Sequence, residues 1–180
     1  THNYSPLQNI QNIVAKSHSY VDTFGENSDS ILIRGETGLG KTFLTNCIAK
    51  DLLDKGHTVY YVTAINMFDS VIGDVVMGKN VNDKTKSLYN NLYDAELLII
   101  DDLGTELTNS YVATQLFQVL NTRLLKGKST IISTNLNLHE LRDRYSERVV
   151  SRIIASYMVF ELYGDNIRYA MRIKGRNQSV

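Results

Sequence analysis

The chain lacks features on which many extracellular and membrane proteins depend. Its 180 residues include a single cysteine, Cys47, which excludes an internal disulfide framework and fits a reducing compartment. No apolar run approaches the roughly 20 residues that a membrane-spanning helix needs, and no signal peptide is visible. The four histidines are scattered without the spacing of metal ligands. We therefore expect a cytoplasmic protein with no membrane partner, in which Cys47 is a small buried residue.

Net charge is zero as well, but the two parts of the chain differ in sign. Residues 1–122 hold 8 basic and 14 acidic side chains, a net charge of −6, whereas residues 123–180 hold 11 and 5, a net charge of +6. Such polarity indicates either a face for nucleic acid or an acidic partner, or simply a fold with one basic end. The length and the 43% hydrophobic content predict one domain over residues 1–180. Because the first residue is Thr1 rather than Met, we expect a fragment or a processed chain.

Apolar β-rich runs alternate with helical patterns along the chain, which is typical of a parallel sheet covered by helices. Strands are predicted at residues 30–35, 57–63, 95–101, 129–135 and 157–162. The first helix is predicted to start at Pro6 after the cap Ser5, and the second to run from about Lys41 to Lys55. Residues 65–93 are predicted to form two helices, with a break near Gly78. Further helices are expected after a cap at Asn109 or Ser110, near Leu138, and over residues 146–155. The helix after Asn109 has an apolar face of Val112, Leu116, Val119, Leu120 and Leu124. The prediction is an α/β fold, a three-layer αβα sandwich around five parallel strands.

Between the first strand and its helix stands the segment "GETGLGKT", which matches the phosphate-loop pattern G-x-x-x-x-G-K-[ST] in full. Its glycines let the backbone wrap a phosphate chain, and the helix N-terminus adds its dipole. Lys41 is expected to neutralise the β- and γ-phosphates, and Thr42 to ligate Mg²⁺. The plain alternative is a glycine-rich turn with a surface lysine. The predicted nucleotide-binding residues are Gly35, Glu36, Thr37, Gly38, Leu39, Gly40, Lys41, Thr42 and Phe43.

The third predicted strand ends in "LLIIDD", with two adjacent carboxylates after four apolar residues. A phosphate loop needs a second strand that delivers an acidic residue to the magnesium shell, and this segment has that form, the Walker B strand. Since successive strand residues point to opposite faces, the two carboxylates are expected to divide the work. Asp101 is predicted to organise Mg²⁺, mostly through metal-bound water, and Asp102 to polarise the attacking water.

Two other classes of phosphate-loop protein fit less well. A GTPase would carry the guanine-reading N-K-x-D, which is absent, and "STNL" follows the fourth strand instead. A small-molecule kinase would need a mobile lid with several arginines and an acceptor pocket, and no segment indicates either.

Six segments occur in an order that points to one family: "GETGLGKTFL", "KGHTVYYVTAINMF", "LLIIDDLGTE", "STIISTNLNLHEL", "YSERVVSRI" and "DNIRYAMRIKG". Together they resemble the AAA+ ATPase domain of bacterial replicative helicase loaders (the DnaC/DnaI type) and of the related IstB transposition helpers. The resemblance covers the chain from about Pro6 onward. It implies a P-loop AAA+ fold that binds ATP with Mg²⁺ and hydrolyses it slowly. It also implies homo-oligomers, in which each subunit completes the site of its neighbour.

The resemblance assigns roles to residues beyond the two Walker motifs. Asn135 of "STN" looks like sensor 1, which helps to place the lytic water. Arg152 looks like the arginine finger inserted into a neighbouring subunit, with Arg148 as its competitor one helical turn earlier. Arg168 looks like sensor 2, with Arg172 as the alternative. For each arginine the plain reading is a surface charge or a structural ion pair.

The partners that the family implies are the replicative helicase and single-stranded DNA. For DNA, the lysines Lys79, Lys84 and Lys86 near Tyr89 and Tyr93 could form a cationic stacking surface, and Tyr111 is a further candidate. The alternative is a solvated lysine-rich helix whose tyrosines pack on the core. An IstB-like helper with a transposase partner is the closest competitor.

The chain departs from the pattern of many AAA+ proteins in three ways. Asp102 stands where many of them have Glu, which leaves the base further from its water and slows hydrolysis. No large C-terminal lid domain is expected, and the N-terminal helicase-binding region of the family is expected to be absent.

Overall fold

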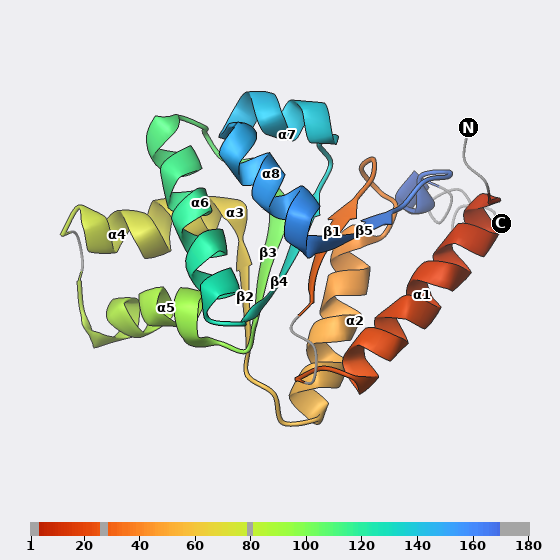
Figure 1. Ribbon diagram of the computed structural model, residues 1–180, viewed down its shortest axis with the longest axis horizontal. Coiled ribbons are helices and arrows are strands. Elements are labelled where there is room, and N and C mark those ends of the chain that lie inside the picture. The colour runs from red at the N-terminus through yellow and green to blue at the C-terminus, as the bar shows by residue number, and fades with distance from the viewer. Residues whose placement is uncertain (1–3, 26–28, 79–80, 170–180) are drawn as a thin grey trace, which may run out of the picture.

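The computed structural model describes residues 4–25, 29–78 and 81–169 (Figure 1). Its centre is a sheet of five strands: β1 Ser30–Arg34, β2 Val59–Thr63, β3 Leu97–Leu103, β4 Ser129–Thr134 and β5 Tyr157–Glu161. The order across the sheet is β2-β3-β4-β1-β5, and each neighbouring pair is parallel. The predicted five-stranded parallel sheet is confirmed. No helix in the described ranges combines the length and the apolar character that crossing a bilayer requires.

Helices connect the strands and begin at the predicted caps. Their bounds are α1 Pro6–Asp22, α2 Lys41–Asp54, α3 Ala64–Asn66, the π-helical segment η1 Met67–Ile72, α4 Gly73–Val76, α5 Asp83–Asp94, α6 Ser110–Leu125, α7 Leu138–Tyr145 and α8 Glu147–Ser156. Ser5 accepts a hydrogen bond from the backbone N–H of Gln8 at 3.2 Å, which satisfies one of the unpaired donors at the start of α1. For α6, Asn109 is the cap, because its side chain accepts from the N–H of Val112 at 2.9 Å.

The two faces of the sheet bury separate apolar cores, which makes the fold three-layered (Figure 1). On β1, Ile31 and Ile33 point into the core under α1 and α2, whereas Leu32 points into the larger core under the remaining helices. This alternation is the period-two rule of a strand, applied to a strand covered on both faces. Both faces of β1 are therefore fixed, and so is the direction in which the loop after it leaves the sheet.

The prediction of two helices over residues 65–93, broken near Gly78, is confirmed: one helical run, which contains η1, covers residues 64–76, and α5 follows at Asp83–Asp94. Two other local expectations were wrong in detail. Cys47 is half-buried rather than buried.

The second correction concerns the apolar face of α6. Leu124 was expected on it, but its side chain is 36% exposed, and Arg123 takes the core position instead.

Arg123 is fully buried among oxygen atoms at the edge of the sheet where the strands begin. Its guanidinium donates to Thr130 Oγ1 (3.0 Å) and to the backbone carbonyls of Leu92 (3.0 Å), Ala95 (3.0 Å), Glu96 (3.3 Å) and Ser129 (2.5 Å). Burial lowers the pKa of Arg123 to about 10. The side chain thus joins the end of α5 to the starts of β3 and β4.

Replacing Arg123 with methionine should lower the free energy of unfolding by about 3 kcal/mol or more. Four backbone carbonyls and one hydroxyl would lose their donor in the interior. Urea unfolding followed by circular dichroism measures the change. The control is Lys126→Ala at the end of the same helix, whose exposed ion pair with Asp94 should matter little. A loss as small as that of the control would contradict the role given to Arg123.

Candidate functional site

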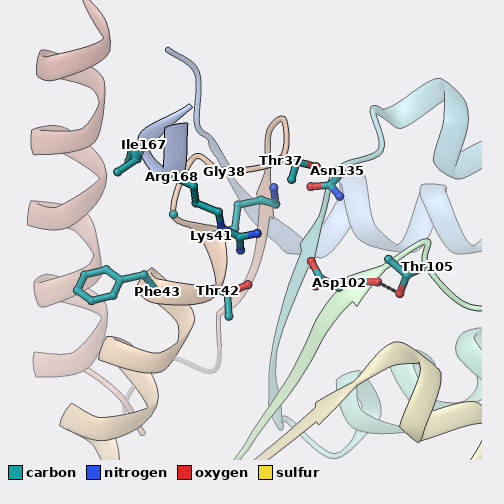
Figure 2. A pocket seen from close by; sticks show the side chains of 11 residues that line it. Thr37, Gly38, Lys41, Thr42, Phe43, Asp102, Thr105, Asn135, Ile167 and Arg168 are labelled. Atoms are coloured by element: carbon teal, nitrogen blue, oxygen red, sulfur yellow. Dashed lines mark hydrogen bonds between the residues drawn. The ribbon is translucent and has the colours of Figure 1, made fainter. Parts of the chain in front are cut away.

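A cavity of about 520 Å³ lies at the carboxyl ends of β1, β3 and β4 (Figure 2). Its lining residues are Thr37, Gly38, Gly40, Lys41, Thr42, Phe43, Asp102, Thr105, Asn135, Ile167 and Arg168. In open parallel sheets this edge is where ligands bind, because neighbouring strands there send their helices to opposite faces. Here β1 leads to α2 on one face, while its neighbour β4 leads to α7 on the other.

The loop before α2 has the local geometry that a phosphate group requires. The N-cap of α2 is Gly40, which has no side chain to cap the helix, so the first-turn N–H groups are left to face the cavity. Gly38 has φ +87°, and a Cβ there would lie 2.3 Å from Asn166 Oδ1. Only glycine fits this position.

Lys41 is the first residue of α2, and its side chain is buried under this loop. Its ammonium donates hydrogen bonds to the carbonyls of Gly35 at 2.7 Å and Glu36 at 2.8 Å. Burial lowers the pKa of Lys41, while the carboxylates of Asp102 and Asp101 oppose that shift. The positive charge is therefore held at the cavity wall by backbone oxygens.

Within the predicted loop, not every residue faces the cavity. Leu39 packs into the core under α1 and α2, and Gly35 and Glu36 line a separate, polar cleft of about 510 Å³ on the other side of the loop. Phe43 does face the cavity and is 76% exposed; with Ile167 it supplies the apolar part of the wall.

Asp101 is buried at the end of β3 and is surrounded by donors. Tyr61 on β2 donates its hydroxyl to Asp101 Oδ2 at 2.5 Å, and Ser133 on β4 donates to Oδ1. The hydroxyl of Thr42 lies 3.5 Å from the same Oδ1. Burial and the Asp101 carboxylate together raise the pKa of Tyr61 to about 12, so the phenol stays a donor at neutral pH.

This arrangement fits a magnesium site. A hydroxyl and a carboxylate oxygen are the kinds of ligand Mg²⁺ takes in phosphate-loop proteins. Because both oxygens of Asp101 already accept hydrogen bonds, the carboxylate is suited to hold the ion through water.

Asp102 occupies an unusual backbone conformation. Its φ is +55°, in the left-handed region that few residues other than glycine adopt, and the pairing of β3 with β4 shifts register between Ile100 and Leu103. The N–H of Asp102 donates to Ser133 Oγ at 2.9 Å, and its carbonyl accepts from Thr105 Oγ1 at 2.8 Å. The bulge turns the Asp102 carboxylate into the cavity (Figure 2). Asp101 stays buried.

Asn135 and Arg168 reach the cavity from two further segments (Figure 2). Asn135 directly follows β4 and lies near Thr37 across from Asp102. Arg168 is brought in by hydrogen bonds to the phosphate loop: Ile167 N–H donates to the Gly38 carbonyl at 3.0 Å. Asn166 likewise donates to the carbonyl of Thr37. Arg172, the alternative to Arg168, lies outside the described residues.

The two candidate finger arginines are not in the cavity. Arg148 and Arg152 lie on α8 and line a separate groove of about 360 Å³ with Phe117 of α6. Arg152 is half-buried and donates to Asn121 Oδ1 at 2.6 Å, whereas Arg148 is exposed.

Four residues at or near the site were not predicted from the sequence: Tyr61, Ser133, Thr105 and Ile167. Tyr61 and Ser133 sit inside strands, where a polar side chain pointing at a neighbouring strand's carboxylate leaves no pattern along the chain. Thr105 follows the Walker B aspartates closely, in "DDLGTE". That closeness along the chain is the one feature of the sequence that indicated a residue near the site.

With this geometry in place, the comparison with known proteins is decisive at the family level. The model of a family described as "IstB-like ATP binding protein" matches residues 7–175. The chain belongs to the IstB-like ATP-binding protein family. It is an ATP-binding protein of the AAA+ ATPase class, and the recognition made from the sequence is confirmed.

The relatives of this IstB-like protein include both replicative helicase loaders and an insertion-sequence ATP-binding protein. The "Replicative helicase loader DnaC" of Escherichia coli (strain K12) is 27% identical over 165 residues, covering 92% of this chain and 66% of the relative. The "Insertion sequence IS21 putative ATP-binding protein" of Pseudomonas aeruginosa is 26% identical over 145 residues, covering 81% of this chain and 52% of the relative. The chain thus spans about two thirds of the former and half of the latter.

Solved structures share the fold. The crystal structure of the DnaC helicase loader superposes with a TM-score of 0.77 at 22% identity, covering 91% of this chain and 94% of that one. The replication initiator DnaA bound to AMPPCP and single-stranded DNA superposes with a TM-score of 0.68 at 22% identity, covering 89% and 50%.

We expect Asp101→Asn and Asp102→Asn to fail at different steps. The first should weaken Mg²⁺-dependent ATP binding about tenfold, because Asp101 is the residue next to Thr42. The second should leave binding within about twofold and lower turnover by about a hundredfold, the usual worth of a positioned base. Titration calorimetry with and without Mg²⁺, beside a phosphate-release assay, separates the two steps. Loss of the same step in both variants would disprove the division.

Proposed function

We propose that residues 1–180 form the ATP-hydrolysing AAA+ domain of a DNA replication helicase loader. The observation that carries this proposal is the convergence of the phosphate loop, both Walker B aspartates, Asn135 and Arg168 at one edge of the sheet. Family membership supports ATP binding, and the helicase-loader side of the family covers more of this chain than the IS21 relative does.

The roles within one subunit follow from the positions of the side chains. Lys41 and the first turn of α2 would bind the β- and γ-phosphates, and Arg168 would contact the γ-phosphate from the opposite wall. Phe43 and Ile167 supply apolar surface on which the base can pack. Thr42 and Asp101 would hold Mg²⁺, which neutralises charge that develops on the phosphates.

Hydrolysis itself would depend on Asp102 and Asn135. Asp102 faces the cavity from a fixed backbone and would accept a proton as water attacks the γ-phosphorus. Asn135 would orient that water through its amide. Aspartate is one methylene shorter than the glutamate of many AAA+ proteins, so the proton has further to travel and we expect slow turnover.

A second subunit would complete the site. Arg152 lies in the α6–α8 groove and not in its own subunit's cavity, so a role in hydrolysis requires a neighbouring copy. We assign the arginine finger to Arg152 rather than Arg148, because the hydrogen bond that Arg152 donates to Asn121 Oδ1 holds its guanidinium in place. A pre-positioned guanidinium loses less conformational freedom when it meets a phosphate.

For the partners, we propose the replicative helicase and single-stranded DNA. The E. coli relative is named a replicative helicase loader, and the solved DnaA structure contains single-stranded DNA. Of the DNA candidates, Lys79 lies outside the described residues, and Tyr111 packs against the core. Tyr89 and Tyr93 are partly buried against the core and make a tilted ring contact with each other, with centroids 5.4 Å apart and an interplanar angle of 58°. They are therefore poorly placed to stack on DNA bases, and we do not assign the DNA surface to them. The IS21 relative favours a transposase as the second candidate partner.

The finger assignment predicts an ATPase rate per subunit that rises with protein concentration. In Arg152→Ala the ATPase rate at high protein concentration should be about a hundredfold or more below that of the wild type. ATP binding should be normal, because the finger acts on the transition state. Arg148→Ala on the same helix serves as the control and should keep most of the rise. The opposite pattern would move the finger to Arg148, and an unchanged rate in both variants would remove it from α8.

The partner proposal is tested by adding purified candidates to the full-length protein. The replicative helicase of the same cell should form a stable complex visible by size-exclusion chromatography, and fluorescein-labelled single-stranded DNA should bind more tightly with ATP than with ADP. Complex formation with a transposase instead would favour the IstB-like reading. Transfer of phosphate to a nucleoside would contradict both and indicate a kinase.

A further inference from the structure

A buried carboxylate stands four residues beyond Asp102 and belongs to no role assigned above. Glu106 lies in the loop between β3 and α6, and its side chain is 0% exposed. Its Oε2 accepts a hydrogen bond from the N–H of Gly104 at 3.0 Å, and its Oε1 accepts from the hydroxyl of Tyr145. Arg144 donates to the backbone carbonyl of Glu106, and its Nε lies 4.0 Å from Oε1.

One end of this contact belongs to the Asp102 loop. The carbonyl of Asp102 accepts from both the hydroxyl and the N–H of Thr105, so the loop from Asp102 to Glu106 is closed by its own hydrogen bonds. Gly104 packs so closely against Leu136 that a Cβ would lie 2.7 Å from its Cδ1. Leu136 directly follows Asn135. Asp102 and Asn135 are therefore linked to Gly104 and Glu106 through hydrogen bonds and close packing.

The other end of the contact belongs to the helices that carry the finger. Tyr145 is the last residue of α7, it is fully buried, and only Ser146 separates it from α8. The ion pair between Arg142 and Glu147, at 2.6 Å, further ties α7 to α8. The position of Tyr145 therefore constrains where α8 starts, and with it the position of Arg152, about one and a half turns into that helix.

The Glu106–Tyr145 contact is costly to break. A buried carboxylate that loses a donor bears the full desolvation penalty, so the two elements are held together rather than sliding independently. Burial and the Glu106 carboxylate both raise the pKa of Tyr145, so its hydroxyl stays protonated and able to donate.

We propose that Glu106 and Tyr145 form a buried clamp that positions α8, and so the finger offered to the neighbouring subunit, according to the arrangement of the Asp102 loop in the same subunit. The clamp acts through Arg152, and neither of its members touches the cavity. This inference rests on the proposed function, because it needs a finger that works in trans. Its consequence is that the state of one subunit's site is passed to the next site around the oligomer.

The direct test is Tyr145→Phe, which removes the hydroxyl and keeps the ring. We expect ATP affinity within about twofold of the wild type and a loss of about tenfold or more in the concentration-dependent ATPase rate, as for a small misplacement of a catalytic group. The matched control is Tyr111→Phe on α6, whose buried hydroxyl has no hydrogen-bond partner among the residues that the structure describes. That control should keep the wild-type rate.

Mixing experiments separate a positioning role from a general structural defect. A Tyr145→Phe subunit keeps Asp102 but has a misplaced finger, whereas an Asp102→Asn subunit keeps a working finger. Mixing the two should restore turnover, because the finger of Asp102→Asn can then complete the site of Tyr145→Phe. Mixing Tyr145→Phe with Arg152→Ala should not, since neither protein then supplies a working finger. Reversed results would place Tyr145 in its own site and would overturn the clamp. No restoration in either mixture, from a Tyr145→Phe protein that still folds and binds ATP, would overturn it as well. Glu106→Gln should behave as Tyr145→Phe does in both mixtures, and it carries the test if Tyr145→Phe does not fold.

One further mixture distinguishes a failure of the clamp from a failure of the proposed function. Arg152→Ala mixed with Asp102→Asn should restore turnover if the finger acts in trans; failure there would contradict the proposed function itself. If that mixture works and Tyr145→Phe alone has the wild-type rate, the clamp alone is wrong.

Discussion

The hydroxyl of Ser133 is the interaction on which the site depends. It donates to the buried Asp101 carboxylate and accepts from the N–H of Asp102, so one side chain on β4 holds both Walker B aspartates. Without that acceptor, the N–H of Asp102 would be unpaired at a bulge and the left-handed backbone at φ +55° would lose its support. The strained residue and the buried carboxylate are thus stabilised together, by a strand that lies between β3 and β1 in the sheet.

The same central position of β4 explains why one cavity can collect so many groups. Its neighbours are the strand before the phosphate loop and the strand that ends in the two aspartates, and Asn135 directly follows it. Residues 166–168 close the cavity on the remaining side through hydrogen bonds to the phosphate loop. Charge is balanced across the cavity, with Lys41 and Arg168 facing Asp102, as a site for an anionic nucleotide and a cation requires (Figure 2).

The arginines show how burial changes the meaning of a residue. Arg123 is a structural group, because five oxygens surround it in the interior. Arg152 is half-buried in a groove beside Asn121, Arg148 is exposed, and Arg168 faces the cavity. Helical spacing alone places Arg123 on the same stripe as Leu116 and Val119, but an apolar pattern names Leu124 as the core residue because arginine is charged. Only packing decides which guanidinium is structural and which can meet a phosphate.

The sequence by itself determined the order of strands and helices, the phosphate loop and the presence of two aspartates at the end of a buried strand. These features are local: periodicity, glycine spacing and caps depend on residues within a few positions of one another. The tertiary structure decided which strands are neighbours, and therefore that Tyr61 and Ser133 donate to Asp101, that a bulge turns Asp102 into the cavity, and that Glu106 meets Tyr145. Such contacts join residues that are about 30 to 40 positions apart. Their geometry follows from how the layers pack, which no pattern of neighbouring residues encodes.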